Sequence, residues 1–154
     1  MNKAIVASIA TLVSLSSLGG CHGEPEHVDA IGKLVRAGAP FTLNDVYPGV
    51  VAKGYFFCQY SDPSEAAPYG FSKAQFYTAD NDVHMWETAT AVGVTFNDGS
   101  APIIEWFPAS EVDACDDTNN RGKTIEPDQV ITITQVNKDL GPQGTRMVPT
   151  LRLT

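Results

Sequence analysis

Basic residues are scarce in this chain. It has 10 Lys and Arg against 18 Asp and Glu among 154 residues, which gives a formal net charge of -8 at pH 7. Because like charges repel over a Debye length of about 8 Å at physiological salt, this balance disfavours nucleic acid and anionic lipid head groups as partners. A basic protein or a divalent cation fits the charge better, although net negative charge also serves simply to keep a domain soluble.

The sequence also lacks the short motifs of common catalytic sites. It contains no HExxH zinc motif, no phosphate-binding loop, no dinucleotide-binding glycine motif and no CxxC pair. Residues 70–74 (GFSKA) have the first half of a nucleophile elbow without its final glycine. Asp82 and His84 should share one face of a strand, where a carboxylate can orient an imidazole, but a surface pair is the simpler interpretation. We therefore expect no enzyme and no cofactor.

The first twenty residues have the layout of an export signal. Lys3 supplies a positive charge, an uncharged run follows at residues 4–18, and two glycines precede Cys21. The run is short and interrupted by Ser and Thr, so it does not suit a helix that spans the roughly 30 Å hydrocarbon core of a bilayer. It is typical of a cleaved address and not of a membrane anchor.

Residues 18–21 (LGGC) resemble the lipobox of bacterial lipoproteins, with a large aliphatic residue three positions before the cysteine and small residues between. The resemblance implies that the Cys21 thiol takes up diacylglycerol, that leader 1–20 is removed, and that Cys21 becomes the acylated first residue. Two or three acyl chains would make membrane attachment effectively permanent. The alternative is ordinary secretion, with cleavage after residues 17–19.

The residue after the lipidated cysteine bears on localisation. In the enterobacterial pathway an Asp there retains a lipoprotein in the inner membrane, and this chain has His22. The resemblance therefore implies the outer membrane, on its periplasmic face or at the cell surface. We expect residues 21–27 to form a lipidated tether and residues 28–154 a single domain, since its length and 43% apolar content suit one core.

Cysteine is rare as well, with three residues in all. Lipidation of Cys21 leaves Cys58 and Cys115, and an even number of thiols in an oxidising compartment predicts a disulfide between them. The bridge would close a loop of about sixty residues, for which chain entropy gives about 4 kcal/mol of stabilisation. The alternative is a reactive Cys58 with His84 as its base, but the aromatic residues around Cys58 disfavour a thiolate.

Hydrophobic periodicity predicts one short helix followed by strands. Val28, Ile31, Leu34 and Val35 recur at helical spacing within residues 27–37, and Gly38 should end this helix. Period-two alternation then predicts seven strands, at residues 50–60, 71–78, 83–88, 90–96, 103–107, 130–136 and 147–153. Asn-Asp-Gly at 97–99 predicts a hairpin, and residues 141–144 (GPQG) should join the last two strands as a second pair. The fold class is mainly β: a single small antiparallel sheet or sandwich with one short N-terminal helix and one disulfide.

Some side-chain orientations follow from these strands. The first strand should direct one alternating set of side chains inward: Val50, Ala52, Phe56, Cys58 and Tyr60. Pro149 cannot donate to a strand ladder, so the last strand should lie at an edge. Residues 108–114 should form one helical turn that leads into Cys115, and residues 116–123 should form a polar loop.

Acidic residues gather around Cys115. Asp113, Asp116 and Asp117, together with Asn119 and Asn120, are oxygen-bearing side chains, but their spacing does not match the EF-hand loop. We therefore expect a solvated loop and no metal site. Because carboxylates steer a basic partner and speed its capture, the three aspartates are the predicted partner-binding residues.

Aromatic residues offer another kind of binding surface. Several of them could form a stacking platform for a sugar or peptide, or belong to the core: Tyr55, Tyr69, Tyr77, Trp86 and Trp106. The sequence leaves these alternatives open.

Compartment, size and charge together favour a protein that acts by binding a protein partner. The chain resembles, in these general properties, the lipid-anchored immunity or inhibitor proteins that neutralise a toxin or hydrolase in the periplasm. A structural or assembly lipoprotein of the envelope shares the same features and is the alternative. A hydrolase would need a nucleophile or paired carboxylates that the sequence does not show.

Overall fold

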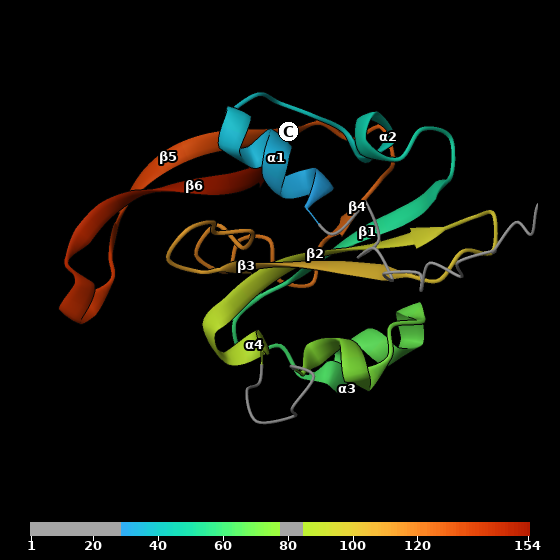
Figure 1. Cartoon of the computed structure of the whole chain (residues 1–154), viewed down its shortest axis with the longest axis horizontal. Coiled ribbons are helices and arrows are strands. Elements are labelled where there is room, and N and C mark those ends of the chain that lie inside the picture. The colour runs from blue at the N-terminus through green and yellow to red at the C-terminus, as the bar shows by residue number, and fades with distance from the viewer. Residues whose placement is uncertain (1–28, 78–84) are drawn as a thin grey trace, which may run out of the picture.

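The fold is mainly β, as predicted, and its strands form two separate antiparallel sheets. The computed structural model describes residues 29–77 and 85–154 (Figure 1). The strands are β1 (Val51–Phe57), β2 (Ala89–Phe96), β3 (Ile103–Pro108), β4 (Thr124–Ile125), β5 (Ile131–Asp139) and β6 (Thr145–Leu153). The helices are α1 (Ala30–Ala37), α2 (Leu43–Val46), α3 (Pro63–Ala66) and α4 (Met85–Thr88), with 3-10 turns η1 (Ala67–Tyr69), η2 (Lys73–Phe76) and η3 (Gly141–Gln143).

One sheet has four strands in the order β3-β2-β1-β4, and the other is the β5–β6 hairpin. Figure 1 shows α1 and α2 over one face of the four-stranded sheet, α3 over the opposite face, and the hairpin reaching away from the sheet. No helix of the described part of the chain is long and apolar enough to cross a membrane. The chain between β3 and β4 connects the two sheets, because Asp113 forms a bridge with Thr150 of β6.

Strand β2 lies in the middle of the structure and is buried on both faces. Val92 and Val94 belong to a cluster beneath α1 and α2, whereas Ala91 packs in a second cluster with Phe71 and Phe76. A strand covered on both faces has a nearly continuous apolar sequence instead of a polar alternation. This explains why residues 89–94 are all buried.

The first strand departs from the simple alternation. The pairing of β1 with β2 shifts register between Val51 and Lys53, and this irregularity reverses which side chains face which cluster. Val51 is buried beside Phe56, and Ala52, predicted to point inward, is exposed. Tyr60 was also predicted to face the core, and this is wrong, because 69% of the residue is exposed. Cys58 is buried, as predicted.

The predicted N-terminal helix is present as α1, and its C-terminus lies at the predicted glycine. Gly38 has φ 71° and its N–H donates to the carbonyls of Leu34 and Val35. At the other end, the buried carboxylate of Glu105 accepts hydrogen bonds from Ile31 N (3.0 Å) and Gly32 N (2.7 Å). Burial raises the pKa of Glu105, and the two backbone donors oppose this shift without cancelling it. The carboxylate thus fastens the start of α1 to β3.

Two predicted strands are wrong. Residues 73–76 within the strand predicted at 71–78 form the turn η2 instead, because Ser72 and Gln75 make a reciprocal capping box that favours a helical turn. Residues 85–88 form α4, whereas 83 and 84 lie outside the described residues. The short strand β4 was not predicted. It pairs Ile125 with Gly54 of β1, and a two-residue strand is too brief for alternation to show.

The two predicted hairpins are confirmed. Strand β2 pairs with β3 from Ala89↔Pro108 to Val94↔Ile103, and Gly99 in the connection has φ 86°. Strands β5 and β6 pair without a bulge from Ile131↔Leu153 to Asp139↔Thr145, which makes this hairpin longer than predicted. Pro149 lies in a strand of a two-stranded sheet, so its strand is an edge, as expected.

A substitution at Gly93 tests the packing of the second cluster. An added Cβ atom would lie 2.5 Å from Phe57 Cε2 and 2.7 Å from Phe71 Cζ, closer than carbon atoms pack. We expect Gly93→Ala to lower the free energy of unfolding by about 1–3 kcal/mol, measured by urea denaturation. Ala52→Ser, which also adds one heavy atom but at an exposed position, should change it by less than about 0.5 kcal/mol. Equal effects of the two substitutions would contradict this packing.

Candidate functional site

A cleft with a volume of about 1000 Å³ lies between the end of the β5–β6 hairpin and the four-stranded sheet. We call it the hairpin cleft. Its sheet side consists of residues 58–60, 87–90 and 108–110, and its hairpin side consists of residues 137–140 and 143. The floor between them comes from the acidic loop, which we define as residues 113–121. The cleft therefore joins segments that are far apart in the sequence.

The predicted disulfide lies in the wall of the hairpin cleft. Cys58 and Cys115 are bonded, with a Cα–Cα distance of 5.6 Å, and both residues are buried. The bond ties the end of β1 to the start of the acidic loop. Cys58 is therefore not the free nucleophile of the alternative hypothesis, and His84, its supposed base, lies outside the described residues.

Buried hydrogen bonds hold the chain just before Cys115 between the two sheets. Asp113 N donates to Pro149 O (2.9 Å) and Leu151 N donates to Asp113 O (2.9 Å), so this segment adds to the free edge of β6. On the sheet side, Thr90 Oγ1 donates to Val112 O (3.1 Å) and accepts from Ala114 N (3.0 Å). This segment is thus bonded to both β6 and β2.

Asn120 is buried inside the acidic loop and hydrogen-bonds to backbone carbonyls at the start of the loop and on β6. Its side chain is buried, and Nδ2 donates to Ala114 O and to Leu151 O, both at 2.9 Å. Its backbone N–H donates to Cys115 O at 3.0 Å. The sequence singled out this asparagine only as a weak candidate for a metal ligand, and its role in the structure is to bind two backbone carbonyls.

The three predicted partner-binding aspartates have different environments. Asp113 is buried and accepts from Cys115 N (2.8 Å), Asp117 N (3.1 Å) and the ammonium of Lys138. Asp116 forms an ion pair with Arg152 at 3.0 Å, and its side chain is only 13% exposed. The side chain of Asp117 is 75% exposed, although it also contacts Lys138. Of the three, Asp117 alone presents most of its carboxylate to solvent.

The backbone of the acidic loop is left-handed over three successive residues. Asp116, Asp117 and Thr118 have φ values of 44°, 50° and 79°. Such conformations are uncommon for residues other than glycine and cost on the order of 1 kcal/mol each, so surrounding contacts must maintain them. The disulfide and the hydrogen bonds to Asp113 and Asn120 supply those contacts.

Tyr60 is a feature of the hairpin cleft that the sequence analysis placed incorrectly. It has φ 61°, is 69% exposed, and lines the cleft. The cause is a tight turn, in which Ser61 N donates to Cys58 O and Cys58 N donates to Ser61 Oγ, both at 3.0 Å. The Ser-Asp-Pro sequence that follows Tyr60 is a turn signal that could have ended the predicted strand earlier.

Charge in the hairpin cleft is negative overall. Four acidic and two basic residues line it, a formal difference of two negative charges: Glu87, Asp113, Asp117 and Asp139 against Arg121 and Lys138. Burial lowers the pKa of Lys138, but hydrogen bonds and charge attraction from Asp113 and Asp117 outweigh burial and raise it. Lys138 is therefore a stable cation that joins the hairpin to the acidic loop.

Four other candidate residues cannot be assigned to any site. Cys21, His22, His27 and Asp82 lie outside the described residues. Within residues 29–77 and 85–154, no group of three or more His, Cys, Asp or Glu side chains is placed to hold a metal ion.

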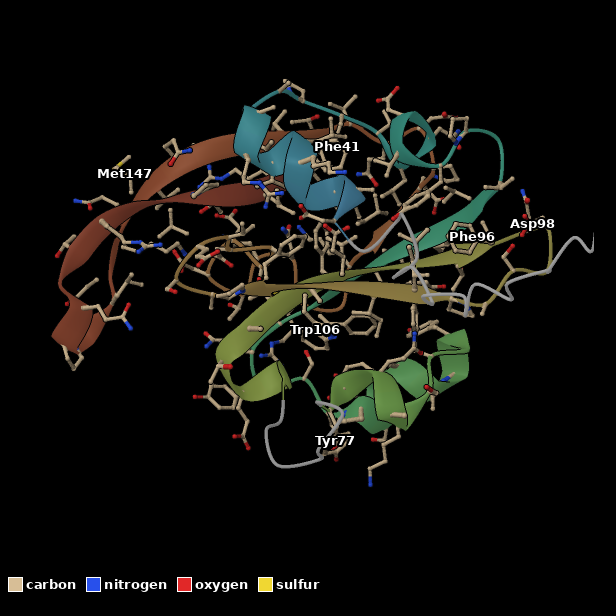
Figure 2. All side chains as sticks on the ribbon, in the orientation of Figure 1. Phe41, Tyr77, Phe96, Asp98, Trp106 and Met147 are labelled. Carbon is tan, nitrogen blue, oxygen red and sulfur yellow. A yellow bond between two sulfur atoms is a disulfide. The ribbon has the colours of Figure 1, made fainter. Side chains whose placement is uncertain are left out.

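Of the two alternatives left open for the aromatic residues, core packing applies to three of the five. Trp106 packs against Phe76 and donates from Nε1 to Gln75 O at 3.0 Å, on the α3 side of the sheet (Figure 2). Tyr55 and Tyr77 pack against the same cluster. Tyr69 is 47% exposed, with its ring centroid 4.4 Å from that of Tyr55. None of these four residues lines the hairpin cleft, and the side chain of Trp86 lies outside the described part of the structure.

Comparison of the chain with protein-family models, with curated protein sequences and with solved structures found no match. The function must therefore be argued from the chemistry of the site itself. Its distinctive elements are the hairpin cleft, the exposed Tyr60 at its wall and the ion pairs of Lys138.

A substitution at Lys138 tests the link between hairpin and acidic loop. We expect Lys138→Met to lower the free energy of unfolding by about 1–3 kcal/mol, because the buried Asp113 loses its cationic partner. The pKa of Lys138 is raised in the folded chain, so its contribution is present below the ordinary value of 10.5 and is lost as pH rises above it. Urea denaturation of both proteins between pH 7 and 12 measures this.

The matched control is Lys123→Met, because Lys123 is exposed on the same loop region and makes no ion pair among the described residues. It should change the free energy of unfolding by less than about 0.5 kcal/mol. If Lys138→Met at pH 7 were as mild as this control, the ion pairs would not be what holds the hairpin to the loop.

Proposed function

We propose that the protein is a lipid-anchored envelope protein that binds a basic protein partner in the hairpin cleft, in the manner of an immunity or inhibitor protein. The observation that carries this proposal is the exposed Tyr60 at the wall of a large cleft. Tyrosine is enriched among the residues that dominate binding energy at protein interfaces. The tight turn and the neighbouring disulfide hold the backbone of Tyr60, which reduces the conformational freedom that its backbone would lose on binding.

The electrostatics of the cleft support a basic partner. The lining residues carry a formal excess of two negative charges, and the whole chain carries -8. Such a field accelerates encounter with a cationic protein more than it adds to affinity. Asp117, with its side chain 75% exposed, is the carboxylate of the acidic loop that is best placed to meet a partner's cation.

The lipobox-like residues 18–21 support membrane attachment through Cys21, with the outer membrane as the proposed location. Helix α1 begins at Ala30, so residues 22–29 separate it from the lipidated residue. Eight residues of extended chain span at most about 28 Å. The domain would therefore stay close to the membrane surface, where an incoming toxin or a resident hydrolase acts.

Metabolic labelling with palmitate tests the anchor. The wild-type chain expressed in a Gram-negative host should incorporate the label and fractionate with the outer membrane, because three acyl chains bind the bilayer permanently. Cys21→Ser should lose all label and be released as an unlipidated chain. Cys58→Ser should retain the label. An unlabelled wild-type chain, or a labelled Cys21→Ser chain, would show that the lipobox interpretation is wrong.

Partner capture tests the cleft. The purified lipidated chain in detergent should recover one basic protein, in near-equal amount, from host envelope extract or from extracts of competing strains. Tyr60→Asn removes the aromatic ring while keeping a residue that tolerates φ 61°, and we expect it to weaken binding of that protein at least tenfold, a loss of about 1.4 kcal/mol or more.

Tyr69→Asn is the matched control, because Tyr69 is an exposed tyrosine that does not line the cleft, and it should bind within about twofold of wild type. Equal binding by the two variants would place the interface elsewhere. Recovery of resident envelope proteins alone would favour an assembly role over inhibition.

A further inference from the structure

The outer edge of β5 has unused hydrogen-bonding groups. Ile131 donates its N–H to Phe41 O (2.8 Å) and accepts at its carbonyl from Phe41 N (3.0 Å), so the backbone groups of Ile131 point away from β6. Alternate residues of a strand share this direction. The backbone groups of four further residues therefore face outward: Ile133, Gln135, Asn137 and Asp139. None of these groups bonds to a backbone atom elsewhere in the described chain.

The other edge of the hairpin is already used near Pro149 and Leu151. On β6, Asp113 bonds to the carbonyl of Pro149 and to the N–H of Leu151. Pro149 has no N–H to offer, which is one of the usual protections of an edge strand. Strand β5 has no proline and no bulge along its nine residues. The outer edge of β6 is thus partly occupied, whereas that of β5 is open from Ile133 to Asp139 and able to accept a strand.

The open edge of β5 borders the hairpin cleft. Asn137 and Asp139, two of the four outward-facing residues, line it, and both are exposed. Tyr60 lines the same cleft from the sheet side. An extended chain that lies along β5 would therefore enter the cleft beside Asn137 and Asp139, at the C-terminal end of β5. There it would meet a surface with a formal excess of two negative charges.

We propose that the partner contributes an extended, basic segment that adds as a third strand to the outer edge of β5, between Ile133 and Asp139. This inference rests on the proposed function and specifies its binding mode. Backbone hydrogen bonds to the open edge would supply affinity, and side chains in the cleft would supply specificity. A second copy of this chain suits the edge less well, because each copy carries a charge of -8.

The test uses random nine-residue peptides displayed on phage and selected against the full chain in detergent. We expect selection of peptides that are rich in Lys and Arg and β-branched residues. A selected peptide, made synthetically, should slow amide hydrogen exchange within residues 133–139. Gln135→Pro removes one outward N–H and should weaken its binding at least tenfold. Proline is tolerated directly opposite this position, since Gln135 pairs with Pro149.

Met147→Pro is the matched control. Met147 is an exposed residue of β6, on the side of the hairpin that faces away from the sheet (Figure 2). It pairs with Asn137, whose backbone groups point away from β6, so the N–H of Met147 points away from β5, to the outer edge of β6. This substitution inserts a proline into the same hairpin without touching the β5 edge, so peptide binding should stay within about threefold of wild type. If Gln135→Pro fails to fold, Asn137→Pro, which lies opposite Met147, replaces it.

Several results would overturn the strand-addition proposal. These are the absence of any selected peptide, equal binding by Gln135→Pro and wild type, and protection confined to the region of Tyr60. Protection of residues 133–139 that grows with chain concentration would assign the edge to a second copy instead. If Tyr60→Asn loses the captured partner while Gln135→Pro keeps it, the proposed function stands and the binding mode is wrong. If no partner is captured at all, the proposed function fails on its own experiment.

Discussion

The structure depends on how a short backbone segment, residues 112–115, is held between its two sheets. Asp113 makes strand-like hydrogen bonds to β6, Thr90 bonds the same segment to β2, and the disulfide of Cys115 fastens it to the end of β1. A two-stranded hairpin alone is marginally stable in water. These bonds, together with the packing of Leu151 into the main core, make the hairpin part of the domain, so it can form one wall of a cleft.

The same anchoring explains why an unfavourable loop conformation persists. Three successive left-handed residues would not hold their conformation in an isolated peptide, where their cost is not offset. Here Asp116 is paired with Arg152 of β6, and Asp117 with Lys138 of β5. The acidic side chains thus serve first to attach the loop to the hairpin. Of the two, Asp117 alone keeps a carboxylate that is largely exposed to solvent.

Much of the fold could be predicted from the sequence, because local patterns report burial on one face. The helix that ends at Gly38, the β2–β3 and β5–β6 hairpins and the pairing of Cys58 with Cys115 all follow from periodicity, turn residues and cysteine count. The failures have physical causes. A bulge reversed the orientation of Ala52, and a capping box at Ser72 turned a predicted strand into a helical turn. The cleft could not be predicted, since its walls come from distant segments.

The candidate site, too, could be predicted only where local sequence patterns determine it. The sequence identified the acidic loop but could not separate a buried Asp113 from an exposed Asp117, because that difference depends on where Lys138 lies in a strand some twenty residues later. Lys138 contacts the loop from the face of β5 opposite to that of the side chains of Asn137 and Asp139, because successive side chains of a strand alternate between its two faces. One strand therefore has two roles: the side chain of Lys138 holds the loop that shapes the cleft, and the outward backbone groups of Asn137 and Asp139 stay open beside that cleft. A cleft built this way requires no motif of adjacent residues.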